Sequence, residues 1–164
     1  VIQRIEMLQL AIENYPHFII DKQEVMRDTP SYTYLTLQQI KNEEPNSELF
    51  LILGMDSLEQ MTSWYKFDQI FNLCHIIVAQ RIAKSSGPNP SNIAPLILEK
   101  FSLNFNLKRE KSGQIFNLNN PLIEISSTQI RMKREENRDI QFLLPEKVLQ
   151  YIKTHNLYQN NVKL

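Results

Sequence analysis

Leu49-Phe50-Leu51-Ile52-Leu53 is an unbroken apolar run, and Gly54-Met55-Asp56 follows it at once. A strand with one face in water alternates polar and apolar residues, whereas a strand of a parallel sheet is covered on both faces and reads as a continuous apolar run. The run therefore predicts a strand buried on both faces that ends at Gly54.

Other segments of the chain repeat this pattern in alternation with helical spacing. A second buried strand is predicted at His75-Ile76-Ile77-Val78-Ala79, and shorter strands at 18–20, 115–118 and 122–125. Apolar residues at helical spacing predict helices over 2–14, from Tyr34 to before Pro45, over 93–101, and from Pro145 onward. The sequence thus predicts an α/β fold with a mainly parallel sheet, and residues 1–164 are expected to form a single domain.

Composition excludes several classes of partner. The chain has 18 Lys+Arg against 18 Asp+Glu, without the cationic excess that nucleic acids or anionic membranes attract. No apolar run approaches the roughly 20 residues that span a bilayer, and the polar first helix does not fit a secretory signal. We therefore expect a cytoplasmic protein with no nucleic-acid or membrane partner, whereas the sequence leaves a homo-oligomer open.

Common catalytic and phosphate-binding motifs are missing from the sequence. The three glycines, Gly54, Gly87 and Gly113, are too far apart for a glycine-rich phosphate loop. The three histidines are scattered, and Cys74 lies in an apolar stretch where it is expected to pack as a small hydrophobic residue. No metal site made by side chains and no activated nucleophile is expected, so phosphate must be bound in some other way.

The residues directly after the predicted strands are the first candidates for a site, because ligands bind beyond the carboxyl ends of parallel strands. Gly54 would let the backbone approach a ligand, and Asp56 could accept hydrogen bonds from ribose hydroxyls. The alternative is that Gly54 serves a turn and Asp56 caps a helix.

A second candidate is Ile125-Ser126-Ser127-Thr128-Gln129-Ile130-Arg131. A helix start with free N–H groups, hydroxyl donors and an arginine one turn later can bind a polyphosphate without glycines. An ordinary capped helix is the alternative interpretation.

Two aromatic features are also candidates. Trp64, the only tryptophan, could stack on a planar ring, although a lone tryptophan is more often part of a core. Pro30-Ser31-Tyr32-Thr33 is a rigid turn with hydroxyls, for which the alternative role is to begin a helix.

Together these blocks resemble the bacterial nicotinate-nucleotide adenylyltransferase family, and the resemblance extends along nearly the whole chain. The matching blocks are Arg4 to Ile12, Arg27-Asp28-Thr29-Pro30-Ser31-Tyr32-Thr33, Gly54-Met55-Asp56-Ser57-Leu58 leading to Trp64, Ile76 to Arg81, Ile125 to Arg131 and Tyr151 to Tyr158. The Pro-Ser-Tyr-Thr and Ile-Ser-Ser-Thr-x-Ile-Arg blocks, in this order and spacing, are the most specific.

The resemblance implies a Rossmann-like nucleotidyltransferase of NAD biosynthesis that transfers adenylate from ATP to nicotinate mononucleotide. It implies that Ser126, Ser127, Thr128 and Arg131 hold the ATP phosphates, that Gly54 and Asp56 line the nucleotide cleft, and that Arg81 contacts the adenine side. It further implies that Trp64 stacks on the nicotinate ring, that Tyr32 and Thr33 recognise the ring's carboxylate, and that Mg²⁺ assists with ATP as substrate. Such a reaction needs positioning and charge neutralisation more than a protein nucleophile.

The sequence departs from the family in three places. The family begins with a strand and a Gly-x-Phe-Asp-Pro-x-His-x-Gly-His turn whose histidines act on the transferring phosphate, and the 164 residues contain no such turn. We therefore expect an amino-terminally incomplete chain without the first strand, and its catalytic residues stay unknown. Leu35 stands where the family usually has aspartate, and Arg81-Ile82-Ala83 where Arg-Pro-Gly is common.

Two other functions stay open on the sequence. One is a related adenylyltransferase that uses nicotinamide mononucleotide, and the other is a degenerate, non-catalytic nucleotide-binding module, for which the missing histidines are the reason. Assays of the two mononucleotides side by side distinguish the nicotinamide mononucleotide enzyme from the nicotinate mononucleotide enzyme. Titration with ATP distinguishes a folded nucleotide-binding module, which binds ATP, from an unfolded remnant, which does not.

The missing histidine turn leads to a first prediction. The 164-residue chain, expressed alone, is expected to form no detectable nicotinate adenine dinucleotide from ATP and nicotinate mononucleotide, as measured by chromatography of the products. Turnover comparable with that of a complete homologue would refute this expectation.

Overall fold

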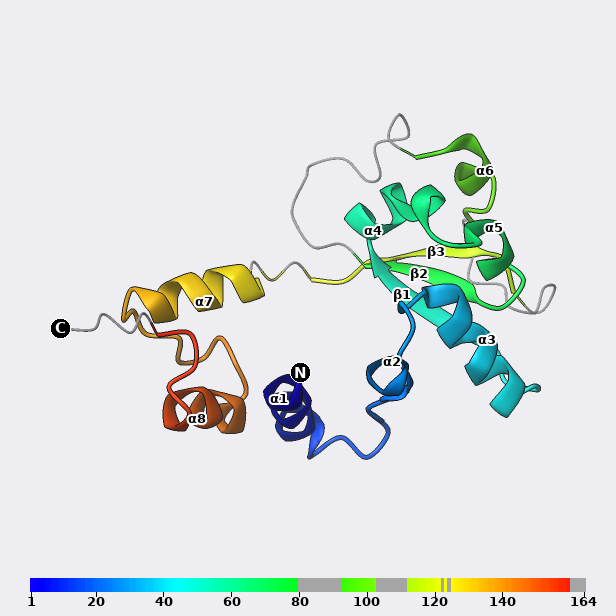
Figure 1. The fold of residues 1–164 in the computed structure, drawn as a ribbon. Helices are drawn as coiled ribbons and strands as arrows, with labels where there is room; N and C mark the ends of the chain where they lie inside the picture. The colour runs from blue at the N-terminus through cyan, green and yellow to red at the C-terminus, as the bar shows by residue number, and fades with distance from the viewer. Residues whose placement is uncertain (80–92, 103–111, 122, 124, 160–164) are drawn as a thin grey trace. The chain divides into compact units, whose positions relative to one another are not determined.

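A computed structural model describes residues 1–79, 93–102, 112–121 and 125–159, together with residue 123 (Figure 1). The chain divides into two compact units, one made of Val1–Met26 with Ile125–Leu164 and the other of Arg27–Glu124. Arg81 and the predicted strand residues Leu122 and Glu124 lie outside the described residues.

The unit Arg27–Glu124 is built on a parallel sheet, as predicted. Strands β1 (Phe50–Gly54), β2 (His75–Ala79) and β3 (Ile115–Leu118) lie in the order β1-β2-β3. The register pairs Leu51 with Ile76, and Ile76 with Ile115. The helices between and around these strands are α3 (Thr33–Glu43), α4 (Met55–Glu59), the 3₁₀ turn η1 (Met61–Ser63), α5 (Phe67–Ile70) and α6 (Pro95–Leu98).

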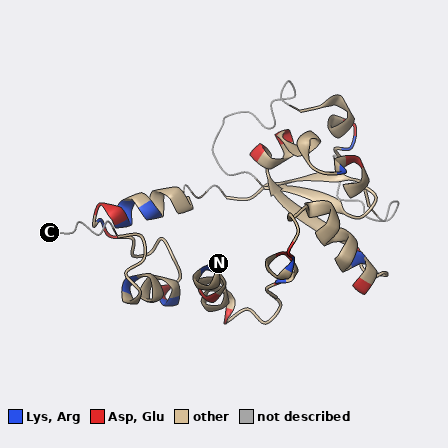
Figure 2. Ribbon diagram, in the orientation of Figure 1, with Lys and Arg blue, Asp and Glu red and all other residues tan. Residues whose placement is uncertain are grey.

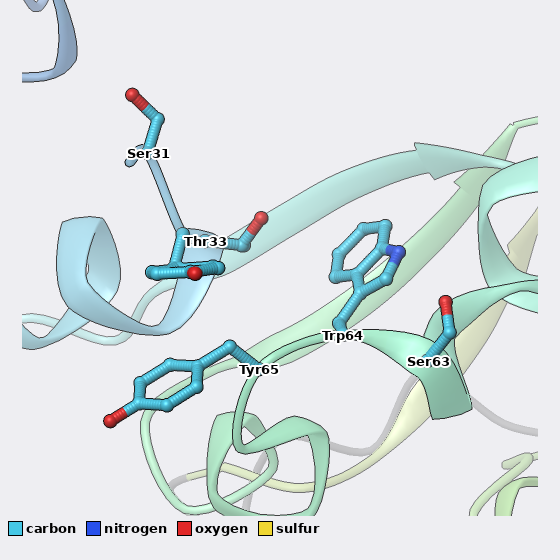
Figure 3. A pocket seen from close by; sticks show the side chains of 6 residues that line it. Ser31, Thr33, Ser63, Trp64 and Tyr65 are labelled. Atoms are coloured by element: carbon cyan, nitrogen blue, oxygen red, sulfur yellow. The ribbon is translucent and has the colours of Figure 1, made fainter. Parts of the chain in front are cut away.

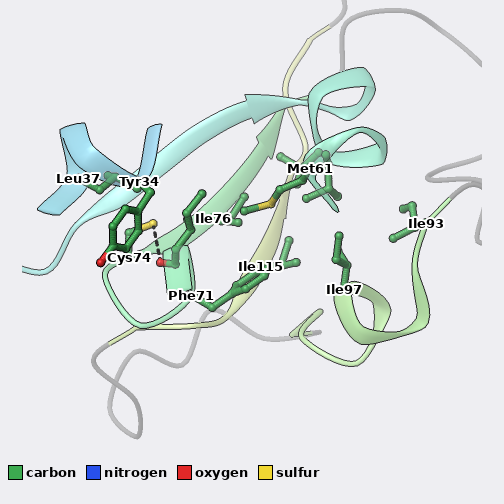
Figure 4. Close-up of a cluster of buried hydrophobic side chains, with 12 residues drawn as sticks. Tyr34, Leu37, Met61, Phe71, Cys74, Ile76, Ile93, Ile97 and Ile115 are labelled. Atoms are coloured by element: carbon green, nitrogen blue, oxygen red, sulfur yellow. Dashed lines mark hydrogen bonds between the residues drawn. The ribbon is translucent and has the colours of Figure 1, made fainter. Parts of the chain in front are cut away.

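The core of this unit surrounds the middle strand. Ile76 and Val78 of β2 are fully buried, as are Leu58 and Met61 from the connection after β1 (Figure 4). Burial of each such aliphatic side chain stabilises the fold by roughly 1.5–3 kcal/mol. The connection that follows β1 is therefore fastened to the sheet through its own apolar residues.

Strand β1 is less buried than its sequence predicts. Its middle residue, Ile52, is 64% exposed, and the other four residues are partly buried. Among the described strands β1 pairs only with β2, so it forms an edge of the sheet. The continuous apolar run correctly predicts a parallel strand, but the expectation of burial on both faces is wrong for β1.

The second unit contains four described helices. They are α1 (Ile2–Ile12), α2 (Gln23–Met26), α7 (Ser127–Glu135) and α8 (Glu146–Thr154). Helices α1 and α8 pack together over Val148, Leu149 and Ile152. At their edges the Tyr151 hydroxyl donates a hydrogen bond to the Glu6 carboxylate, which raises the pKa of Tyr151, and Lys147 forms an ion pair with Glu13.

Two of the predicted strands are not found among the residues that the structure describes. Phe18-Ile19-Ile20 has no regular structure, and Ile19 is 90% exposed. Ile123 and Ile125, the described residues of the predicted strand 122–125, are likewise exposed and outside any strand. A strand is stable only when a neighbouring strand accepts its backbone hydrogen bonds, and a local apolar pattern carries no information about that neighbour.

Charged residues of both signs lie on the helices and connections, and the three strands carry no Lys, Arg, Asp or Glu (Figure 2). Within the part of the chain that the structure describes, no helix is long and apolar enough to cross a bilayer.

The contrast between β2 and β1 gives a stability prediction. Ile76→Ala removes a fully buried side chain between β1 and β3 and should lower the free energy of unfolding by about 2–5 kcal/mol. Ile52→Ala, on the exposed face of β1, should cost less than about 1 kcal/mol. Urea unfolding followed by the fluorescence of Trp64 measures both, and equal costs would contradict the edge position of β1.

Candidate functional site

A pocket of about 280 Å³ opens in the unit Arg27–Glu124. Its lining comes from two segments that are distant in sequence, as Figure 3 shows: Ser31, Tyr32 and Thr33 from one, and Ser63, Trp64 and Tyr65 from the other. Three aromatic side chains and five hydroxyl groups line the pocket, and both segments contribute hydroxyls. Such a lining suits a planar ring with a polar substituent.

The first segment enters the pocket because helix α3 begins there. Tyr32 is the residue before the helix, with φ −120° and ψ 129°, and its carbonyl accepts hydrogen bonds from the N–H groups of Leu35 (2.9 Å) and Thr36 (3.2 Å). Thr33 is the first helical residue. The sequence offered two interpretations of this turn, a binding element and a helix start. The structure confirms the helix start and places it at the pocket, and the binding role stays a prediction.

The second segment enters the pocket because η1 ends at Trp64. The Trp64 N–H donates to the Met61 carbonyl at 2.9 Å, and the backbone then becomes extended, with φ −77° and ψ 148°. Trp64 is partly buried against the core and also lines the pocket. The core and ring-binding interpretations of this tryptophan therefore do not exclude each other.

Aromatic contacts order the pocket wall. The rings of Tyr32 and Tyr65 lie 4.7 Å apart between centroids and are tilted by 34°. Both side chains are close to half exposed, so each presents ring surface to a ligand as well as to its partner. Tyr65 and Ser63 were not predicted as site residues; their position directly beside Trp64, in the connection between two helical segments, is the signal that could have found them.

Gly54 and Asp56 lie in the turn from β1 into α4. Gly54 precedes the helix with φ −80° and ψ 159°, a conformation open to any residue, so the turn does not require glycine there. Asp56 is the second residue of α4 and is exposed. The expected role as helix cap is wrong for Asp56, because the N-cap position belongs to Gly54 and no side chain caps this helix.

The segment 126–131 forms the start of α7. Ser126 is the N-cap: its hydroxyl accepts from the Gln129 N–H at 3.2 Å, and its own N–H donates to Gln129 Oε1 at 3.1 Å, which completes a capping box. Arg131 reaches back along the helix and donates from Nη2 to Thr128 Oγ1 at 3.3 Å. The alternative interpretation as a capped helix is thus correct, and the hydroxyls of Ser127 and Thr128 and the Arg131 guanidinium are exposed beside that cap.

The candidate residues belong to different units. Tyr32, Thr33, Gly54, Asp56 and Trp64 lie in Arg27–Glu124, and those of 126–131 lie in the other unit. The structure brings Tyr32, Thr33 and Trp64 together in one pocket. Arg81 is outside the described residues.

Cys74 is not a nucleophile in this structure. Its side chain is fully buried, its Sγ donates to the Ile70 carbonyl at 3.6 Å, and burial raises the pKa of the thiol to about 12. The described residues contain no group of three His, Cys, Asp or Glu side chains placed to hold a metal ion.

Comparison with known proteins supplies the family. The family profile described as cytidylyltransferase-like matches residues 1–133. A probable nicotinate-nucleotide adenylyltransferase of Shewanella frigidimarina is 37% identical over 158 residues, which cover 95% of this chain and 75% of that protein. The chain belongs to the nicotinate-nucleotide adenylyltransferase family. A further member, from Legionella pneumophila, is 38% identical over 96% of this chain and 75% of its own length.

Solved structures agree with the family in fold. A nicotinic acid mononucleotide adenylyltransferase of Plasmodium falciparum complexed with NaAD superposes with a TM-score of 0.67 at 22% identity, covering 96% of this chain and 74% of that one. A second structure of that enzyme, complexed with APC, gives a TM-score of 0.63 at 22% identity, covering 95% of this chain and 74% of that one. The predicted Rossmann-like nucleotidyltransferase fold is confirmed.

The burial of Cys74 gives a prediction about its reactivity. Because only the thiolate reacts with an aromatic disulfide reagent, and the pKa of Cys74 is about 12, the folded chain should show almost no reaction at pH 8. In denaturant, one thiol per chain should react within minutes. Rapid labelling of the folded chain would show that Cys74 is accessible and ionised.

Proposed function

We propose that the chain supplies the substrate-binding residues of a nicotinate-nucleotide adenylyltransferase of NAD biosynthesis, the enzyme that transfers adenylate from ATP to nicotinate mononucleotide and releases pyrophosphate. The observation that carries the proposal is the pocket, because it is formed by the Pro-Ser-Tyr-Thr turn and the Trp64 segment, two of the blocks by which the chain resembles its family. The names of the relatives support the same reaction.

The pocket would hold the pyridine ring of the mononucleotide. That ring is planar and positively charged, so the indole face of Trp64 attracts it both by stacking and by its negative electrostatic potential. The first N–H groups of α3 point out of the helix without intrahelical acceptors, and the helix dipole favours an anion at this end. Tyr32 and Thr33, which begin α3, would therefore bind the carboxylate of nicotinate.

The start of α7 would hold the phosphates of ATP. Ser127 and Thr128 offer N–H and O–H donors at a helix N-terminus, Ser126 adds its hydroxyl, and Arg131 adds a fixed positive charge one turn away. Gly54 and Asp56 would line the nucleotide cleft, where the exposed Asp56 carboxylate can accept hydrogen bonds from ribose hydroxyls, and Arg81 would contact the adenine side.

The reaction is an in-line displacement. A phosphate oxygen of nicotinate mononucleotide forms a bond to the α-phosphorus of ATP, the bond from that phosphorus to the bridging oxygen breaks, and pyrophosphate leaves with the electron pair. No protein nucleophile takes part, so the residues contribute by alignment and by neutralising charge. Mg²⁺ would arrive on the ATP phosphates as part of the substrate, since this ion is usually held by substrate phosphates with only one or two carboxylates.

We also place the protein in the cytoplasm. Its one cysteine is a buried free thiol, which needs no oxidising compartment.

Binding measurements test the proposal without depending on turnover. Nicotinate mononucleotide should quench the fluorescence of Trp64 in a saturable manner, and calorimetry should detect ATP. Tighter binding of nicotinamide mononucleotide would favour the related adenylyltransferase, ATP binding without either mononucleotide would favour the non-catalytic module, and binding of none of them would reject the proposal.

A paired substitution tests the phosphate role of α7. Arg131→Gln should raise the Kd for ATP about tenfold or more, because it removes a charge-assisted contact. Arg138→Gln is the matched control: Arg138 lies just after the same helix but is paired with Glu136 at 2.5 Å, and its loss should change the Kd by less than about twofold. Calorimetric titration of both variants measures the Kd for ATP. Equal Kd values for the two variants would show that Arg131 does not contact ATP.

A further inference from the structure

Lys66 follows the pocket residue Tyr65 and has an unusual backbone conformation. Its φ of 51° and ψ of 43° place it in the left-handed region, which is unfavourable for residues other than glycine, asparagine and aspartate. Such a conformation persists where the surrounding contacts hold it.

The Lys66 ammonium lies over two aromatic rings. Its Nζ is 4.8 Å from the ring centroid of Tyr34 and 5.3 Å from that of Tyr65, both within the roughly 6 Å at which a cation is attracted to a ring face. Tyr34 is only 7% exposed, and its hydroxyl accepts a hydrogen bond from Gln38 at 3.1 Å. The ammonium thus bridges an immobilised core ring and a ring of the pocket wall.

Tyr65 depends on such contacts because it is 44% exposed. It packs against Tyr32 on the pocket side, and against Tyr34 in an edge-to-face arrangement with centroids 6.1 Å apart and an interplanar angle of 71°. Lys66 adds a third contact, which ties the orientation of Tyr65 to the core. A change at Lys66 should therefore reach the pocket, although Lys66 is not one of its lining residues.

Lys66 also supplies charge. None of the lining residues is Asp, Glu, Lys, Arg or His. The ion pairs found among the described residues, Arg138–Glu136 and Lys147–Glu13, do not involve Lys66. Its positive charge consequently acts on the pocket wall without an ion pair to a carboxylate of the described residues.

We propose that Lys66 is a positioning residue that makes this pocket select planar rings bearing a carboxylate over the corresponding carboxamides. The ammonium holds Tyr65 against Tyr32 and raises the electrostatic potential of the pocket, which stabilises an anionic substituent and leaves a neutral one unaffected. The inference rests on the proposed function, since nicotinate mononucleotide is the ring that the pocket is proposed to hold.

The test compares two mononucleotides on three variants. Quenching of Trp64 gives the Kd of nicotinate mononucleotide and of nicotinamide mononucleotide for the unmodified chain, Lys66→Met, Lys66→Arg and Lys100→Met. Lys66→Met keeps the aliphatic stem and removes the charge, and Lys66→Arg keeps both the charge and the ring contact. Lys100→Met is the matched control, because Lys100 lies 4.7 Å from the ring centroid of Phe71, which is not a lining residue of the pocket.

Lys66→Met should raise the Kd of nicotinate mononucleotide about threefold to tenfold and that of nicotinamide mononucleotide by less than about twofold. Most of the preference for nicotinate mononucleotide should then disappear. Lys66→Arg and Lys100→Met should keep the preference within about twofold. Added salt should reduce the preference of the unmodified chain and have little effect on Lys66→Met.

Three results would overturn the inference. If Lys66→Met binds both ligands with the original preference, Lys66 does not select the ring, and the proposed function is untouched. If Lys100→Met loses the preference as well, the effect comes from general destabilisation. If the unmodified chain binds neither mononucleotide, the proposed function of the pocket fails, and the role of Lys66 fails with it.

Discussion

The pairing of β2 with β1 on one side and β3 on the other is the interaction on which the unit Arg27–Glu124 depends. It places Ile76 and Val78 at the centre of the core. Leu58 and Met61 pack into the same core and fix the connection that follows β1. That connection ends in Trp64, so the position of the pocket is set by the burial of apolar residues several positions before it.

The sequence predicts those elements whose signal is contained in their own residues. β2, β3, α3 and α8 follow from apolar runs or helical spacing, and the structure confirms them. Two predictions were wrong: the strand at Phe18-Ile19-Ile20 and the burial of Ile52. Whether a strand forms, and whether its face is covered, depends on the segments packed beside it, which the local sequence does not specify. That residues 1–164 form one domain stays a prediction.

The site was predictable to the extent that single residue types carry the chemistry. A lone tryptophan and a hydroxyl-rich turn marked Trp64, Tyr32 and Thr33, and the structure places them in one pocket. Tyr65 and Lys66 carried no such mark, because their importance comes from ring and cation contacts between segments that only folding brings together. Ser126 shows the converse: its pattern fits a capping box and a phosphate site equally well, since both use the same N–H and O–H groups.

Tyr34 belongs at once to the hydrophobic core and to the contacts that hold Tyr65. On the proposed role of Lys66, selection for stability and selection for ligand preference would act on the same side chain. A substitution in the core near Tyr34 should then change the orientation of Tyr65 at the pocket, and two relatives with identical lining residues should differ in ligand preference. The residues that determine ligand preference would in that case extend beyond those that line the pocket.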